Sequence, residues 1–262
     1  KEMGFRSGLT GVIERPVLKG ILPRRMRVGL AEQGEYAYMA TIEALEQAKI
    51  NQQYFDDHEV GIIYGNDSST VPVVESVDNI RAKKDTTLLG SGAIFQSMNS
   101  TITMNLSVIF KLKGINFTVS AACASGSHAI GLGYYFIKSG LQQMVICGGA
   151  QEINAYSMGS FDGLSAFSVR EDDPVRASSP FDANRDGLVP SGGGATVILE
   201  SYENAKKRGA NILAEVIGYG YSSNGDHISV PNVDGPVRSL EPRYLAAPVC
   251  DMPQLEAVQF AT

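Results

Sequence analysis

One cysteine of this sequence lies where a protein could activate a thiol. Cys123 follows residues 117–119, which have strand propensity, and precedes an apolar helical stretch. The small residues around it, SAACASG, leave room for a sharp turn from strand to helix. A thiol at a helix N-terminus faces unpaired N–H groups and the positive end of the helix dipole, and both favour thiolate. The pattern predicts a nucleophile, although a lone cysteine between alanines also fits a small core residue.

The three histidines offer little help as a general base for this thiol. His128 is five residues further along the same predicted helix, which turns it about 140° away from Cys123. His58 follows two aspartates ahead of a strand and fits a solvated turn. His227, in the polar stretch SSNGDHISVPN, is the histidine that we expect near a site.

Other familiar chemistries leave no strong trace in the sequence. The glycine run 191–194 leads into a strand instead of a helix, so it is not typical of a dinucleotide-binding loop. Serine-hydrolase, P-loop and zinc-protease motifs do not occur. Cys123, Cys147 and Cys250 are odd in number and widely spaced, which argues against a zinc site and a disulfide framework. We therefore expect no metal and a reducing compartment.

Composition fits a globular chain. Of 262 residues, 44% are hydrophobic and 19% are charged, with a net charge of −6, so general nucleic-acid binding is not expected. The sequence contains no run of about 18 apolar residues and no basic-then-apolar leader. We expect a cytoplasmic protein without membrane association.

Hydrophobic periodicity predicts alternating helices and strands. Residues 1–19 show no sustained period, so we expect irregular structure there. The predicted helices are 35–50, 91–110, a helix after Cys123, 156–164 and 202–208, and the predicted strands are 59–64, 115–120, 144–148, 195–199 and 212–216. This order is typical of an α/β protein whose helices cover a mostly parallel sheet.

Several separated motifs resemble one family. SAACASGSHAIG, then GGAQE, then SPFDANRDGLVPSGGGATVILE are similar to the elongating β-ketoacyl-acyl-carrier-protein synthases of the thiolase-like superfamily. The resemblance implies a thiolase-like α/β fold with a mixed sheet covered by helices. It implies a domain at 1–240 that is the family's N-terminal half without its first strand and helix, while 241–262 form a tail that does not resemble the family.

The resemblance also implies a two-step mechanism. Cys123 takes an acyl chain from the phosphopantetheine of acyl carrier protein, and malonyl carrier protein then condenses with it after losing carbon dioxide, as in fatty-acid biosynthesis. No other cofactor is implied. By position, Phe161 matches an acyl-pocket residue, Met98 a pocket residue from the dimer mate and His227 an entrance-rim residue. Phe161 and Met98 fit ordinary core positions equally well.

The family's condensing machinery has no counterpart in this chain. Two histidines, a lysine and a glycine-rich oxyanion segment belong to the family's C-terminal half. The resemblance therefore predicts that this chain can be acylated at Cys123 but cannot condense alone.

Two basic clusters and one strand suggest partners. The clusters match the family's basic docking face for the acidic carrier protein, although such runs also fit a solvated surface. They consist of Arg24, Arg25 and Arg27, and of Arg81, Lys83 and Lys84. The strand that begins at Ile115 and ends at Ser120 matches the family's dimer strand, which implies a homodimer.

Three hypotheses stay open from the sequence. The chain is a condensing enzyme or its N-terminal half, a non-catalytic partner of the chain-length-factor type, or another acyl-CoA enzyme of the thiolase superfamily. Partner subunits usually lack the nucleophile, so Cys123 counts against the second. Acyl chain length, fatty-acid against polyketide pathway, the source of the missing half and the origin of the tail stay undetermined.

Overall fold

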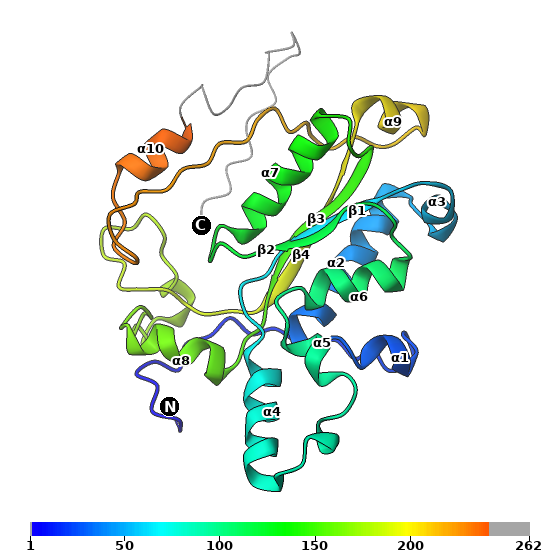
Figure 1. Ribbon diagram of the computed structural model, residues 1–262. Helices are drawn as coiled ribbons and strands as arrows, with labels where there is room; N and C mark the ends of the chain where they lie inside the picture. The colour runs from blue at the N-terminus through cyan, green and yellow to red at the C-terminus, as the bar shows by residue number, and fades with distance from the viewer. Residues whose placement is uncertain (1, 241–262) are drawn as a thin grey trace.

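A four-stranded sheet forms the centre of the computed structural model, which describes residues 2–240 (Figure 1). Its spatial order is β2-β1-β3-β4. The strands are β1 (Gly61–Gly65), β2 (Asn116–Val119), β3 (Met144–Gln151) and β4 (Gly193–Glu200). β1 pairs in parallel with β2 and β3, whereas β4 runs antiparallel to β3. The expected mixed, mostly parallel α/β sheet is confirmed. Our predictions for the tail at 241–262 and for Cys250 lie outside the described residues.

The central strands are buried on both faces, with alternate residues facing opposite sides. Ile62 and Tyr64 of β1 belong to one apolar cluster, and Ile63 belongs to the other. In β3, Ile146 and Cys147 divide in the same way. This period of two follows from the pleat of a strand, so helices must cover both faces.

One face is covered by α2 (Glu32–Ala48) and α6 (Thr101–Phe110). Leu45, Ile102, Leu106 and Phe110 are buried there, with Ile102 and Leu106 fully so. The Tyr64 hydroxyl joins this layer because it bonds to the hydroxyls of Thr41 on α2 and Thr196 on β4.

The other face is covered by α7 (Ser125–Lys138), which connects β2 to β3 and crosses β1 (Figure 1). Gly133 lies against the sheet, where a Cβ would come within 2.4 Å of the Cys147 Sγ. On the opposite side of the helix, a Cβ on Gly131 would lie 2.3 Å from the Tyr219 ring. Segment 210–221 therefore lies on the outer side of α7.

The remaining helices surround this core. They are α1 (Arg24–Arg27), α3 (Gln52–Asp57), α4 (Thr70–Lys83), α5 (Ala93–Ser97), α8 (Ala155–Gly163), α9 (Tyr202–Lys207) and α10 (Asp234–Leu240), with 3₁₀ turns at Thr86–Leu89 and Pro174–Arg176. Within residues 2–240, no helix has the length and apolarity needed to cross a membrane.

Most predicted elements are confirmed within a few residues, and two are wrong. The helix predicted at 91–110 is two helices, because Met98 is extended and Asn99 forms hydrogen bonds with residues 66 and 67 instead of continuing the helix. The strand predicted at 212–216 is irregular. Just beyond it, the carbonyls of Ile217 and Tyr219 accept hydrogen bonds from tyrosine hydroxyls of α7, at 3.4 and 3.3 Å, not from a neighbouring strand. Helix α4 was not predicted, and none of its residues is buried.

Candidate active site

Cys123 lies in the short loop that joins β2 to α7. It is exposed, and it directly precedes Ala124, the N-cap residue of α7. The parallel strands β1 and β2 end at this edge of the sheet, in the register Gly65 to Val119. Ligands of open α/β sheets bind beyond the carboxyl ends of such strands. The predicted position of the thiol at a helix N-terminus is therefore confirmed.

The loop folds back on itself through hydrogen bonds of Ser125. The Ser125 hydroxyl accepts from the Ala121 N–H at 2.8 Å and donates to the Ala122 carbonyl at 2.6 Å. The N–H of Ser125 also donates to the Ala122 carbonyl, at 3.1 Å. Ala122 has a φ of 48°, in the left-handed region that side chains with a Cβ rarely adopt. The residue before the thiol is therefore held in a costly conformation by its neighbours.

Gly65 allows the start of α7 to approach the sheet. A Cβ at this position would lie 2.4 Å from the backbone of both Ser125 and Gly126. Only glycine permits this approach, so β1 sets the depth at which the helix N-terminus rests on the sheet.

Asp67 is a site residue that sequence reasoning missed. Its Oδ1 accepts hydrogen bonds from the Ser120 hydroxyl at 2.5 Å and from the Ala122 N–H at 3.2 Å. The available signal was its place two residues after β1, because a polar residue at the carboxyl end of a strand can reach the loop after the neighbouring strand.

Glu152 is a second missed residue, at the end of β3. It is buried, and its Oε1 accepts from the Ser68 hydroxyl at 3.0 Å and the Thr70 N–H at 2.6 Å. Its carboxylate thus holds the first residue of α4 against the end of the sheet.

Cys147 differs from Cys123 in its exposure to solvent. It is fully buried in the cluster under α7, and burial raises the pKa of its thiol. A protonated, inaccessible thiol is a poor nucleophile. Of the two cysteines in the described part of the chain, only Cys123 is exposed.

The histidines are engaged elsewhere. The His128 Nδ1 pairs with the Tyr219 hydroxyl, as expected for a histidine on another side of α7. His58 stacks on Tyr54, with ring centroids 4.1 Å apart. The His227 Nδ1 accepts from the N–H groups of Ser229 and Val230, at 3.1 and 3.0 Å, in an exposed turn. Its role at an entrance rim stays a prediction.

The predicted pocket residues lie on separate elements. Phe161, on α8, stacks on Phe167 with ring centroids 6.2 Å apart, and the residue is 41% exposed. Met98, directly after α5, is 40% exposed. Neither packs as ordinary core, and their assignment to an acyl pocket stays a prediction.

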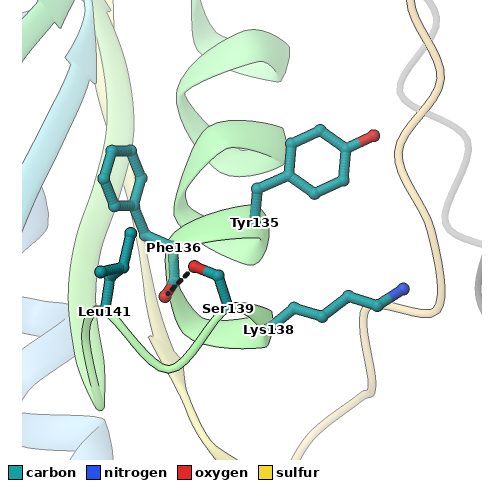
Figure 2. A pocket seen from close by; sticks show the side chains of 5 residues that line it. All are labelled: Tyr135, Phe136, Lys138, Ser139 and Leu141. Carbon is teal, nitrogen blue, oxygen red and sulfur yellow. Dashed lines mark hydrogen bonds between the residues drawn. The ribbon is translucent and has the colours of Figure 1, made fainter.

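Cys123 lines neither of two hollows on the surface of the described residues. One of about 680 Å³ runs along β2 and the start of α6. The other, of about 470 Å³, lies at the end of α7 remote from Cys123. Figure 2 shows Phe136 and Leu141 on its sheet side, with Tyr135 and Lys138 pointing outward toward segment 210–221. Among residues 2–240, no group of three or more His, Cys, Asp or Glu could hold a metal ion.

The basic clusters occupy two different helices. Arg24 and Arg25 are exposed on α1, while the Arg27 Nε donates to the Leu22 carbonyl at 3.0 Å. The other three residues, Arg81, Lys83 and Lys84, are exposed at the end of α4. Arg27 therefore has a structural bond, while the other five remain candidates for docking.

Comparison with known proteins shows which family this chain matches. Residues 16–205 match the family model described as "Beta-ketoacyl synthase, N-terminal domain". The 3-oxoacyl-[acyl-carrier-protein] synthase 1 of Haemophilus influenzae is 31% identical, with 98% of this chain and 67% of that protein covered. The enzyme of the same name from Escherichia coli K12 is 32% identical, with 92% and 60% covered.

Solved structures give the same result. A β-ketoacyl synthase from Burkholderia phymatum superposes with a TM-score of 0.79 at 34% identity, covering 88% of this chain and 57% of that one. A ketosynthase of a type II polyketide synthase, solved with its acyl-carrier protein, gives a TM-score of 0.80 at 26% identity over 94% and 60%. The chain thus spans about 60% of the length of most of these relatives.

Proposed function

The chain belongs to the β-ketoacyl synthase family, and from this premise we propose that Cys123 accepts an acyl chain from acyl carrier protein. The observation that supports the proposal most is the exposed thiol at the N-terminus of α7, directly after Ala122 in its left-handed conformation. The full activity of the family's enzymes involves a longer chain, so we treat the steps separately.

The acylation step needs a thiolate and a place for negative charge. The Cys123 thiolate attacks the carbonyl carbon of the carrier-bound thioester, a new C–S bond forms, and the phosphopantetheine thiolate leaves and takes up a proton. We propose that the backbone N–H of Cys123, together with the positive end of the α7 dipole, stabilises the oxygen that becomes negative in the tetrahedral intermediate. This step uses only groups that the loop and the helix N-terminus offer.

The condensation step needs more. Loss of carbon dioxide from malonyl carrier protein leaves an enolate, whose charge requires preorganised donors. Neither His128, paired with Tyr219, nor His227, bonded to its own turn, is arranged as such a donor. We therefore propose that this chain alone is acylated without condensing.

Two surfaces support partners for this activity. Arg24, Arg25 and the exposed basic residues of α4 offer positive charge to an acidic carrier protein, and a relative's ketosynthase was solved with its acyl-carrier protein. Strand β2 is an edge of the described sheet, and we propose that two chains join there as a homodimer.

Acylation is tested by mass spectrometry. The chain is incubated with octanoyl carrier protein, and the adduct is mapped to a peptide. We expect one octanoyl group on Cys123, its loss in Cys123→Ala, and no change in Cys147→Ala, the matched control. An unmodified chain, or an adduct that persists in Cys123→Ala, would reject the proposal. Transfer from octanoyl coenzyme A at an equal rate would instead support the acyl-CoA alternative.

A further inference from the structure

Asp67 links two loops at the end of the sheet. It follows β1, whereas Ser120 and Ala122 follow β2, yet one carboxylate oxygen accepts from both of them. Both backbone polar groups of Ala122 are therefore bonded: its N–H donates to Asp67, and its carbonyl accepts from Ser125. The bonds of Ser125 are local to the loop. Those of Asp67 tie the loop to the sheet.

The backbone of Asp67 is itself anchored. The neighbouring Asn66 is buried and donates its N–H to the Val119 carbonyl at 3.1 Å and its side-chain amide to the Asn99 carbonyl at 2.7 Å. Asn99 returns a bond from its own amide to the Asp67 carbonyl, at 3.2 Å. These bonds hold the backbone of residues 66 and 67, and so they fix the position from which the Asp67 carboxylate reaches the loop.

Ala122 needs these hydrogen bonds to keep its conformation. A residue with a Cβ is disfavoured at a φ of 48°, and this conformation persists only where the surroundings determine it. If the N–H of Ala122 were released, the peptide before Cys123 could relax toward ordinary backbone angles. The Sγ and the N–H groups at the start of α7 would then lose their relative positions.

We propose that Asp67 is the positioning residue of the nucleophile loop, holding Ala122 in the left-handed conformation that presents Cys123 for acyl transfer. It acts as a hydrogen-bond acceptor and does not touch the acyl group. This inference rests on the proposed function of Cys123 as acyl acceptor. The exposed position of Asp67 means that solvent screens its charge, so accepting the two bonds is what matters.

Three variants separate these roles. Asp67→Ala removes the acceptor, whereas Asp67→Asn keeps an Oδ1 that can accept both bonds and replaces the charged carboxylate by a neutral amide. Asp57→Ala is the matched control, because this exposed carboxylate accepts a bond from the Gln53 side chain at 2.9 Å on α3. If Asp67→Ala does not fold, Ser120→Ala removes one of the two donors and is tested in its place.

The first measurement is hydrogen exchange of the peptide containing residues 120–125 in the full chain. We expect at least about tenfold faster exchange in Asp67→Ala, and exchange within about twofold of wild type in Asp67→Asn and Asp57→Ala. Unchanged exchange in Asp67→Ala would overturn the proposal.

The second measurement compares two reagents at Cys123. The octanoyl thioester of N-acetylcysteamine tests acyl transfer without carrier docking, and iodoacetamide tests thiol access alone. We expect acyl transfer to fall at least about tenfold in Asp67→Ala with alkylation within about threefold, because misplacement harms the oriented reaction most. Asp67→Asn should restore transfer. Failure of this rescue, or equal losses with both reagents, would overturn the proposal. If wild type is not acylated, the proposed function falls, and hydrogen exchange alone decides whether Asp67 holds the loop.

Discussion

The two faces of the sheet are packed to different degrees. On the side of α2 and α6, sixteen buried residues form one cluster. On the side of α7, the apolar cluster has four buried residues and eight more that are only partly covered. The same strands supply both faces, so the difference lies in what covers them: two helices on one side, and one helix with an irregular segment on the other (Figure 1).

We expect this difference to be reflected in the stability of the fold. Burial of apolar surface dominates the free energy of folding, so the α2 and α6 side is expected to carry most of it. Helix α7, which follows Cys123, lies on the less covered side. Its start is in close backbone contact with Gly65, and the loop before it donates hydrogen bonds to Asp67. Each prediction below tests whether the two faces really differ.

Alkylation of the two described cysteines should show the largest contrast. In the folded chain at pH 8, we expect Cys123 to react with iodoacetamide at least about 1000-fold faster than Cys147, because Cys147 is buried and its raised pKa keeps it protonated. Peptide mapping over time measures both rates, with the urea-unfolded chain as the control in which the rates converge. Comparable rates in the folded chain would mean that α7 does not seal its face of the sheet.

Adjacent isoleucines of β1 provide a matched pair for packing. Ile62 and Ile63 are both fully buried but point to opposite faces. We expect Ile62→Ala to lower the free energy of unfolding by about 4 kcal/mol and Ile63→Ala by about 2.5 kcal/mol, because the looser surroundings of Ile63 can collapse around the cavity. Urea denaturation measures both. Equal losses would show that the two faces are equally rigid.

Two tyrosines, one on each side of the sheet, allow the two faces to be compared through the loss of stability at high pH. Burial raises the pKa of Tyr64 to about 12 and that of Tyr219, on the α7 side, to about 12. An acid whose pKa is raised in the fold stabilises it fully below the unfolded pKa of about 10, and this contribution is lost as pH rises to about 12. For the fully buried Tyr64, the loss reaches up to about 2.7 kcal/mol.

The measurement is urea unfolding at pH 8, 9, 10 and 11. We expect Tyr64→Phe to flatten the loss of stability above pH 10, and Tyr219→Phe to flatten it much less, since solvent screens the half-buried ring. A larger change in Tyr219→Phe than in Tyr64→Phe would contradict this order.

Carrier docking should show the smallest effect. Helix α1 lies on the side of α2 and α6. Leu22 and Met26 belong to or pack against the larger apolar cluster there, so the position of the exposed arginines on α1 is fixed by packing. We expect Arg24→Glu with Arg25→Glu to weaken carrier-protein binding about tenfold, or about 1.4 kcal/mol, and the wild-type affinity to fall with salt. Calorimetry measures both. Lys206→Glu with Lys207→Glu on α9 is the control of equal net charge, and an equal loss there would remove α1 from the docking surface.

The sequence predicted what depends on local pattern. Strand propensity and small residues located Cys123 at a helix N-terminus, and periodicity located α2 and most strands. The break between α5 and α6 could not be predicted in this way, because it arises from bonds between Asn99 and residues 66 and 67, which are distant in sequence. Asp67 and Glu152 were missed for the same reason: each binds a loop that only the folded sheet brings near.

The left-handed Ala122 limits which residues can replace it. A β-branched side chain at a φ of 48° would meet its own backbone, so valine, isoleucine and threonine are excluded there, whereas glycine, asparagine and aspartate tolerate the angle. A saturation library at position 122, selected only for folded chain, should therefore sort residues by backbone tolerance and not by hydrophobicity. The residue beside Cys123 is thus constrained by its backbone conformation.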